Sequence, residues 1–227
     1  MMQRRLSPDA PAIKARLQRE QITTLYHFTD IRNLPGIYML KALCSKQMLD
    51  NKGIEPYSGG NSLSYNLDHW NNNWDKIFLS LTPYTPMAYR LKQNRRVCCL
   101  FINPIVTTWK GVEFTDTNAT SNDHRRGTGI QGLNYINFSA IQAKTDTANI
   151  EGWFKPVQAE VLVPEYIPFE YIDKIAFKFK KDIVDAQSLC GHQAKFSEDQ
   201  VPFLDTWPSS NINDDCFDDF DDLDMPF

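Results

Sequence analysis

The stretch Val157-Gln158-Ala159-Glu160-Val161-Leu162-Val163 decides the fold, because its small and branched apolar residues recur at every second position. This period of two predicts a β-strand with one fully apolar face, and it places Gln158 and Glu160 together on the other face. A carboxylate in an otherwise apolar strand costs desolvation free energy unless a partner or a substrate uses it. Two interpretations stay open: Glu160 is functional, or the strand lies at a sheet edge with its polar face in water.

Strands predominate along the rest of the chain, and the helices between them are short. Further strands are predicted over 22–29, 77–82, 96–102 and 172–180, the last with Ile175, Phe177 and Phe179 facing inward. Helices are predicted over 8–20, from Asn33 along a stripe of Ile37, Leu40 and Leu43, over 86–92 and over 182–189. This pattern favours the α+β class, with a central, mainly antiparallel β core and peripheral helices.

The composition is that of an ordinary globular protein: 227 residues, of which 42% are hydrophobic and 23% charged. It excludes collagen-like, coiled-coil and wholly disordered chains. No apolar run reaches the roughly 18 residues of a membrane span, and no apolar run follows the basic N-terminus, so a cytoplasmic protein without a secretory signal is expected. The cysteine spacings do not suit zinc, and Cys98 and Cys99 are expected to be buried free thiols on opposite faces of a strand.

The net charge of −4 is divided unevenly along the chain. Seven aspartates lie in the last fourteen residues, whereas residues 1–192 carry a net charge of +5. A basic body with an acidic tail indicates nucleic acid as a partner for the body and an interaction role for the tail.

Two other predicted strands carry polar residues that chemistry could use. In Leu25-Tyr26-His27-Phe28-Thr29, His27 and Thr29 share a face, and in Phe78-Leu79-Ser80-Leu81-Thr82, Ser80 and Thr82 share a face. Each signal alone has a structural reading, since a lone strand histidine is commonly a satisfied core residue and hydroxyls commonly cap strand ends.

Taken together, the three strands resemble the NAD-binding core of ADP-ribosyltransferases: Tyr-His-Phe-Thr, Ser-x-Thr and Gln-x-Glu, in that order. More narrowly, the chain from about residue 22 to about 185 is similar to the DarT family, toxins that ADP-ribosylate bases in DNA. The matching segments are Tyr26–Pro35, Pro83–Tyr89, Phe114–Ala119 and Gln158–Pro164. The resemblance implies an ADP-ribosyltransferase-like fold and NAD as co-substrate, with no metal.

The resemblance also implies roles for individual residues. Glu160 would stabilise the oxocarbenium-like ribose carbon and handle the proton of the target base, and His27 would hydrogen-bond the adenosine ribose of NAD. The implied catalytic set is Glu160, Gln158 and His27. The implied NAD-binding set is Tyr26, His27, Phe28, Thr29, Asn33, Gly36, Ser80, Thr82, Tyr84 and Tyr89. A segment over about 46–76 would fold over NAD, and one over about 114–159 would form a substrate-reading loop that ends on Glu160.

Nucleic-acid contacts are expected in that second segment. The candidates for phosphate contact and base stacking on single-stranded DNA, or on RNA, are His124, Arg125, Arg126, Trp153 and Lys155. For Arg125 and Arg126 an exposed, solvated turn is an equal alternative. One position departs from the family pattern, because Tyr84 stands where the DNA-modifying members carry a catalytic arginine between two prolines.

The acidic C-terminus resembles the tip of bacterial single-stranded DNA-binding proteins. There an apolar anchor and a terminal carboxylate are captured by a partner, which here would be a replication or repair protein. The residues that would bind it are Asp221, Asp222, Asp224, Pro226 and Phe227. A solubilising tail and an autoinhibitory tail are the alternatives. The predicted division is a helical extension over 1–21, a catalytic domain over 22–192, a linker over 193–213 and the tail over 214–227.

The leading hypothesis is a toxin-like, NAD-dependent ADP-ribosyltransferase that modifies a nucleobase in single-stranded DNA and is neutralised by a macrodomain-type antitoxin. Two alternatives remain. The acceptor is RNA or protein, or the chain is a catalytically inactive binding protein that acts through its tail.

Overall fold

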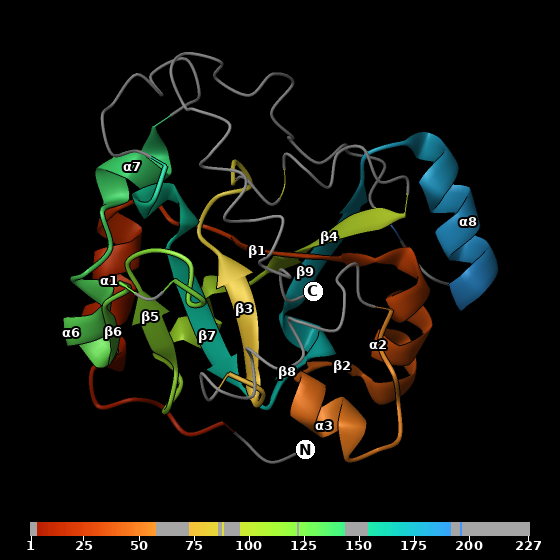
Figure 1. Cartoon of the computed structure of the whole chain (residues 1–227), viewed down its shortest axis with the longest axis horizontal. Coiled ribbons are helices and arrows are strands. Elements are labelled where there is room, and N and C mark those ends of the chain that lie inside the picture. Colours follow the sequence, from red (N-terminus) through yellow and green to blue (C-terminus); the bar gives the residue numbers. More distant parts are fainter. Residues whose placement is uncertain are drawn as a thin grey trace.

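The computed structural model describes residues 4–57, 73–85, 88, 96–121, 123–143, 154–191 and 196. Its main sheet contains β1 (Leu25–Asp30), β3 (Lys76–Ser80), β4 (Val97–Ile102), β5 (Glu113–Thr115), β6 (Arg126–Thr128), β7 (Glu160–Pro164) and β9 (Ile172–Phe177). These seven strands lie in the order β6-β5-β7-β3-β1-β4-β9, and every pairing is antiparallel (Figure 1). A second sheet pairs β2 (Ala42–Cys44) with β8 (Tyr166–Pro168). The predicted α+β class with an antiparallel core is therefore confirmed.

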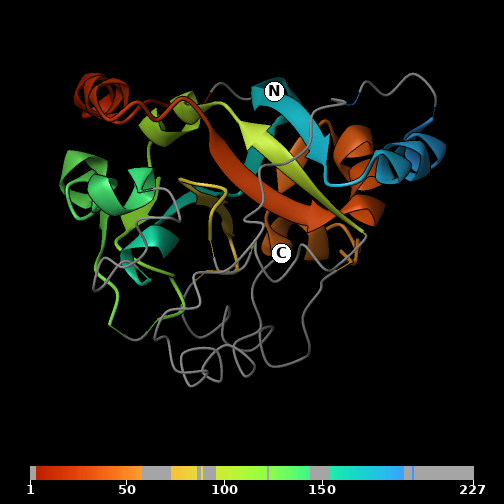
Figure 2. The same ribbon diagram turned by 90° about the horizontal axis from the view of Figure 1, so that it is seen from above.

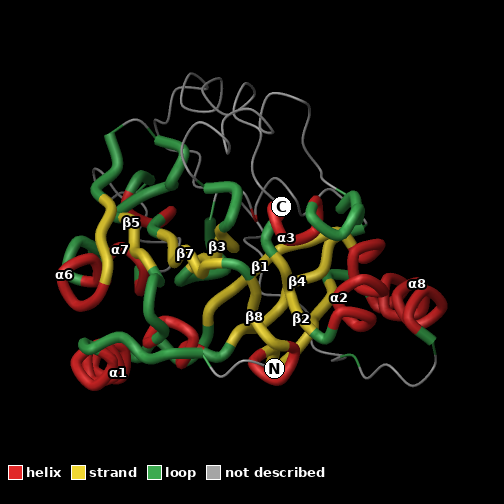
Figure 3. The backbone as a smooth tube through the Cα atoms, turned by 90° about the horizontal axis from the view of Figure 1, so that it is seen from below, coloured by secondary structure: helices red, strands yellow, loops and turns green. Residues whose placement is uncertain are grey.

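The helices are short and lie around the sheet. They are α1 (Ala10–Arg19), α2 (Leu34–Leu40), α3 (Lys46–Asp50), α6 (Gly129–Leu133), α7 (Phe138–Gln142) and α8 (Lys180–Cys190), with 3₁₀ turns η1 (Ile31–Asn33), η2 (Pro104–Thr108), η4 (Pro156–Gln158) and η5 (Phe169–Tyr171). Helices α1, α6 and α7 lie at the β5–β6 end of the sheet, and α2 and α8 lie at the opposite end (Figures 1, 2 and 3). None of the helices in the described part of the chain is long and apolar enough to cross a bilayer.

Two hydrophobic clusters lie on opposite faces of the sheet. The larger contains Leu79, Leu100 and Val161, all fully buried, and the smaller forms around Phe28 and Cys99. The side chains alternate between these clusters because successive strand residues face opposite ways. Cys98 and Cys99 follow this rule: both are buried and free, and burial raises the pKa of each thiol, as expected for inert core residues.

The N-terminal helix packs onto the same core. Ile13 and Leu17 of α1 belong to the larger cluster. The Asp9 carboxylate, just before α1, accepts the backbone N–H of Ile130 at 3.0 Å and so ties α1 to α6. The described part of residues 1–21 is thus packed against the body of the protein.

Several predicted boundaries are wrong for local reasons. Residues 157 and 158 lie in η4 and not in a strand, because Pro156 favours the start of a helical turn, and β7 begins only at Glu160. Leu43 lies in β2, because α2 ends where Lys41 adopts a left-handed conformation with φ 53°. Phe179 is 39% exposed and caps α8, so β9 ends at Phe177.

Candidate active site

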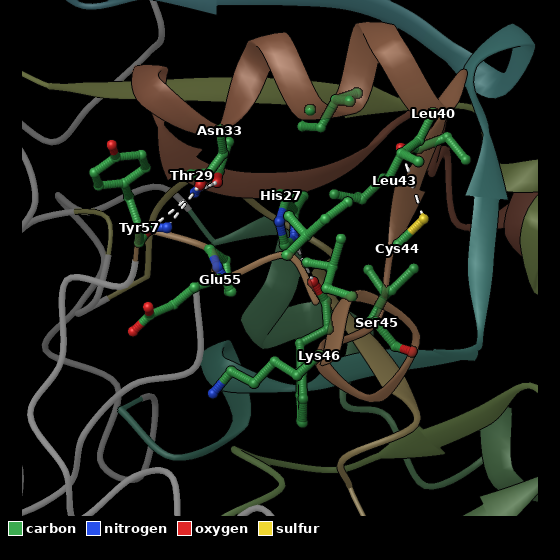
Figure 4. Close-up of a pocket in the computed structure, with 18 of the residues that line it drawn as sticks. His27, Thr29, Asn33, Leu40, Leu43, Cys44, Ser45, Lys46, Glu55 and Tyr57 are labelled. Atoms are coloured by element: carbon green, nitrogen blue, oxygen red, sulfur yellow. Dashed lines mark hydrogen bonds between the residues drawn. The ribbon is translucent and has the colours of Figure 1, made fainter. Parts of the chain in front are cut away.

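Strands β1 and β3 pair at one position and then diverge. Tyr26 lies opposite Ser80, and this is the one registered pair between the two strands in the described residues, whereas β3 and β7 share five. Beside the divergence lies a cavity of about 190 Å³, bounded also by α2 and α3. Its lining includes the predicted NAD-binding residues His27, Thr29, Asn33 and Gly36 (Figure 4).

His27 fills the position where β3 leaves β1. Its side chain is buried, and its Nδ1 lies 3.0 Å from the backbone oxygen of Phe78. Since a carbonyl oxygen only accepts hydrogen bonds, Nδ1 carries the proton and Nε2 of the neutral ring is an acceptor. Burial lowers the pKa of His27, although the Phe78 hydrogen bond opposes this effect. The lowered pKa favours the neutral form of the ring. The ring can therefore accept a hydrogen bond from a hydroxyl group in the cavity.

Asn33 forms hydrogen bonds with the residues that cover one end of the cavity. Its Oδ1 accepts the backbone N–H of Tyr57 at 2.8 Å, and its Nδ2 donates to the Tyr57 oxygen at 2.9 Å and to Thr29 Oγ1 at 3.1 Å. The Arg32 guanidinium lies 4.3 Å from the centre of the Tyr57 ring and is itself paired with Asp30 at 2.6 Å. Described residues after position 46 line the cavity up to Tyr57, and residues 58–72 lie outside the described part. That this segment folds over NAD stays a prediction.

The far end of the cavity is apolar. Leu40 and Leu43 lie there, away from Tyr57, as Figure 4 shows. Gly36 on α2 also lines the cavity, and a Cβ added to it would meet no atom within 4 Å. The backbone of α2 is thus directly accessible from the cavity at this position.

Glu160 lies in one row of side chains that crosses four strands. Thr115, Glu160, Ser80 and Tyr26 are successive partners on β5, β7, β3 and β1. Directly opposed residues of an antiparallel pair share a face, so Glu160 and Ser80 are neighbours. Phe78 lines the cavity and precedes Ser80 by two residues, which is roughly 7 Å along a strand. Glu160 therefore lies across from a residue two positions along β3 from Phe78, which lines the cavity.

The Glu160 carboxylate is held by the turn that follows β5. Its Oε2 accepts the backbone N–H of Ala119 at 2.8 Å, and the Glu160 backbone N–H donates to Thr115 Oγ1 at 3.2 Å. The Thr115 hydroxyl in turn donates to the Thr117 oxygen at 2.7 Å. Sequence reasoning singled out the segment Phe114–Ala119 only by resemblance, and the structure places it around Glu160.

The other polar candidate residues, Ser80, Thr82 and Gln158, make different contacts. Ser80 and Thr82 are buried, and Thr82 Oγ1 accepts the backbone N–H of Tyr84 at 3.3 Å. Gln158 is buried in η4, where its Nε2 donates to the Phe154 oxygen at 3.0 Å. Its buried Oε1 has no hydrogen-bond partner among the described residues. The predicted strand face shared by Gln158 and Glu160 is thus replaced by a turn followed by a strand.

Five of the predicted NAD-binding residues are described but do not line the cavity: Tyr26, Phe28, Ser80, Thr82 and Tyr84. Phe28 is 2% exposed within the smaller hydrophobic cluster, so it is a core residue. Tyr26 packs edge-on against Phe101, with ring centres 5.2 Å apart, and burial, with smaller effects of Cys99 and Tyr84, raises its pKa to about 12. Tyr89 lies outside the described residues.

The predicted nucleic-acid residues divide into two kinds. Arg126 is half-buried and structural: its Nε bonds the Glu113 carboxylate and its Nη1 donates to Asn73 Oδ1 at 2.7 Å. Burial alone would raise the pKa of Glu113, but Arg126 and Lys76 lower it overall. This half-buried pairing engages the Arg126 guanidinium within the sheet, and its contact with nucleic acid stays a prediction.

The remaining basic residues lie at the surface, near the turn after β5 that holds the Glu160 carboxylate. The side chains of Arg125 and Lys155 are 65% and 70% exposed, and they face Asp116 at 2.7 Å and Asp123 at 4.0 Å. His124 Nδ1 lies 2.5 Å from the Ser121 oxygen. Trp153 lies outside the described residues. The predicted loop over 114–159 is wrong as a single loop, because its described part contains β6, α6, α7 and η4.

A metal centre finds no ligand set in the described ranges. No group of three or more histidine, cysteine, aspartate or glutamate side chains there could hold a metal ion.

Comparisons with solved structures find proteins with a similar fold. The solved structures include Thermus sp. 2.9 DarT in complex with NAD+, at 19% identity and a TM-score of 0.59, covering 81% of this chain and 96% of that one. The same protein in complex with ADP-ribosylated single-stranded DNA gives 19% identity and a TM-score of 0.60 over 89% and 98% of the two chains. Thermosipho africanus DarTG in complex with ADP-ribose gives 18% and 0.56 over 74% and 47%. These likenesses show the fold.

The sequence comparisons address the family. Curated protein sequences give no match. A sequence profile described as "ssDNA thymidine ADP-ribosyltransferase, DarT" matches residues 26–201, which include every strand of the main sheet except the first residue of β1. The chain therefore belongs to the DarT family of single-stranded DNA thymidine ADP-ribosyltransferases.

Proposed function

We propose that this protein transfers ADP-ribose from NAD+ to a thymine base in single-stranded DNA, with Glu160 as the catalytic carboxylate. The observation that carries the proposal is the position of Glu160. It neighbours Ser80 on β3, the strand whose Phe78 oxygen bonds His27, and the Ala119 N–H holds its carboxylate. Family membership and the solved DarT complexes with NAD+ and with ADP-ribosylated DNA support the choice of substrates.

The reaction needs a negative charge and a proton acceptor at one point. The bond between nicotinamide and ribose C1′ breaks, and nicotinamide leaves with the electron pair, so positive charge develops on the ribose. A fixed carboxylate stabilises that charge where it forms. The thymine ring nitrogen then bonds to C1′, and Glu160 takes the proton that this nitrogen carried.

The cavity supplies groups that match the rest of NAD+. The neutral His27 ring offers its Nε2 to a ribose hydroxyl, while Thr29, Asn33 and Gly36 line the adjoining wall. The apolar end around Leu40 and Leu43 suits the flat face of a base. Ser80, Thr82, Tyr84 and Gln158 would lie between this cavity and Glu160.

DNA would approach from the surface that carries the exposed cations. Arg125 and Lys155 are accessible; Arg125 pairs with Asp116 in the turn that holds the Glu160 carboxylate, and Lys155 precedes η4, which leads into β7. Their role would be to hold phosphates, which fixes the strand while the base is presented to the site. His124 and Trp153 are the proposed neighbours of this surface.

The biological setting is proposed from the sequence. An enzyme of this kind would act as a cytoplasmic toxin, and a macrodomain-type hydrolase would neutralise it. The acidic tail over 214–227 lies outside the described residues, and recruitment of replication or repair proteins through Phe227 is its proposed use.

The test is mass spectrometry of oligonucleotides incubated with the protein and NAD+. A thymidine-containing single-stranded DNA should gain one ADP-ribosyl group per modified base, with release of nicotinamide. Glu160→Gln keeps the shape of the side chain and an acceptor for Ala119 but removes the charge. It should lower the transfer rate by about 10²- to 10³-fold.

Testing different acceptor molecules distinguishes this function from the alternatives. An oligonucleotide without thymidine should stay unmodified under the same conditions. Label on RNA or on protein with none on DNA would overturn the assignment of the acceptor. NAD+ binding without transfer to any acceptor would favour a catalytically inactive binding protein.

A further inference from the structure

We propose that the turn over residues 116–121 is a positioning element for the Glu160 carboxylate, and that the buried hydroxyl of Thr115 sets its geometry. The inference rests on the proposed function, because it concerns the residue assigned to catalysis there. None of the residues in this turn needs to touch a substrate. They act through Glu160.

The turn meets Glu160 at two atoms. The Ala119 N–H reaches Oε2 at 2.8 Å, and Thr115 Oγ1 accepts the Glu160 backbone N–H at 3.2 Å. Ala119 and Thr115 are both fully buried, so water is excluded from taking over either bond. A side chain with several rotatable bonds is thereby fixed at its carboxylate and at its backbone.

Thr115 links these two contacts. Its hydroxyl oxygen accepts from Glu160, while its proton goes to the Thr117 oxygen at 2.7 Å. The next hydroxyl, that of Thr117, donates to the Lys155 oxygen at 2.8 Å. Lys155 precedes η4, which leads into β7, so the turn is tied to the segment that delivers Glu160 to the sheet.

Hydrogen bonds between Asp116 and Arg125 close the turn on its β6 side. The Asp116 carboxylate accepts the Arg125 backbone N–H and the Arg125 Nε, both at 2.7 Å, and the Asp116 N–H donates to the Arg125 oxygen at 3.2 Å. Inside the turn, Asn118 Oδ1 accepts the N–H and the hydroxyl of Thr120 at 2.8 and 2.6 Å. The Ala119 N–H is therefore presented by a turn whose ends and interior are both fixed.

The precision of this arrangement matters for chemistry rather than for binding. Displacing a catalytic group by about 1 Å can lower turnover by about 10²-fold. The His27 cavity shares none of these hydrogen bonds. Loosening the turn should therefore reduce kcat while leaving the KM for NAD+ unchanged.

The decisive variant is Thr115→Val, which keeps the shape of the side chain and removes the hydroxyl. We expect kcat for DNA modification to fall about tenfold or more, the effect of about one lost hydrogen bond in the transition state. Thr115→Ser restores a hydroxyl and should recover most of kcat. The measurement is steady-state transfer to a thymidine oligonucleotide, with KM for NAD+ determined for each variant.

A matched control separates positioning from stability. Thr108 is also buried, and its hydroxyl donates to the Ile105 oxygen at 2.7 Å within η2, outside the site. Thr108→Val should lower the thermal unfolding midpoint about as much as Thr115→Val, with kcat unchanged. A similar loss of kcat in both variants would show that general destabilisation is the cause and would overturn the inference.

A second measurement uses the backbone donor itself. Ala119→Pro removes the N–H, whereas Ala119→Gly keeps it, so the proline variant alone should lose turnover. Wild-type kcat in folded Thr115→Val overturns the positioning role even if Ala119→Pro fails to fold. If Glu160→Gln is inactive in that case, the proposed function stands and this inference alone fails. An active Glu160→Gln enzyme would instead remove the basis of both.

Discussion

The cavity around His27 and the carboxylate of Glu160 are the two ends of the proposed site, and different kinds of contact hold them. At the His27 end, Thr29, Asn33 and Tyr57 come from one stretch of chain and bond one another. At the Glu160 end, the carboxylate meets Ala119, which is 41 residues away in the sequence. The cover of the first end is held by bonds among residues 29–57, while the His27 ring itself bonds Phe78 of β3. The Glu160 end is held by pairing of the distant strands β5 and β7.

This difference assigns separate tasks to the two ends. The cover of the cavity depends on bonds within residues 29–57 and on the His27–Phe78 bond, an arrangement that suits binding. A carboxylate fixed across β5 and β7 depends on the register of those strands, which suits chemistry that needs a defined atom position. Substitutions at the His27 end should change the affinity for NAD+, and those at the Glu160 end should change turnover.

The largest effect expected at the binding end comes from His27→Asn. The asparagine Nδ2 can still donate to the Phe78 oxygen, but the acceptor at Nε2 is lost. We expect the Kd for NAD+ to rise about tenfold or more, since a bound hydroxyl would lose its partner in a buried site. Isothermal titration with NAD+ measures this directly.

His27→Gln is the matched variant, because its amide reaches towards the Nε2 position but does not reproduce the Phe78 bond. A lowered kcat with unchanged Kd in His27→Asn would contradict the separation of binding from chemistry.

A smaller effect is expected from Asn33→Asp. The carboxylate still accepts the Tyr57 N–H but no longer donates to the Tyr57 oxygen. The segment that ends at Tyr57 should loosen, and the Kd for NAD+ should rise roughly threefold to tenfold, as for one weakened hydrogen bond. The exposed Asn51, at the end of α3, supplies the control Asn51→Asp. Equal affinities in the two variants would show that the cover over the cavity does not contribute to binding.

Much of the fold follows from sequence periodicity. The strands that carry His27, Ser80 and Glu160 are visible as alternating patterns, and the antiparallel α+β class follows from their number and spacing. The same alternation places Phe28 on the face opposite His27, so its burial in the smaller cluster was available from the pattern. This burial of Phe28 conflicts only with the role in NAD binding that the family resemblance implies for it.

The rest depends on contacts that periodicity does not encode. The pattern does not indicate that β3 lies between β1 and β7, which is the arrangement that brings Ser80 next to Glu160. Nor does it give the register of β5 on β6, which places Arg126 against Glu113. The use of Phe114–Ala119 as a holder for Glu160 is likewise a long-range property.

The smallest expected effect is a pH dependence of stability that belongs to the His27 end. Burial, opposed by the Phe78 hydrogen bond, lowers the pKa of His27 in the folded protein below its ordinary 6.5. In the window just below pH 6.5 the unfolded chain therefore binds more protons than the folded one, so the free energy of unfolding falls as the pH falls. The slope from one such group is at most about 1.4 kcal/mol per pH unit. Urea unfolding at pH 7.5 and pH 5.5 should show this loss in the wild type and a smaller loss in His27→Asn. An equal loss in both proteins would mean that His27 is protonated as readily in the fold as in water, and that its Nε2 is not the fixed acceptor on which the binding end depends.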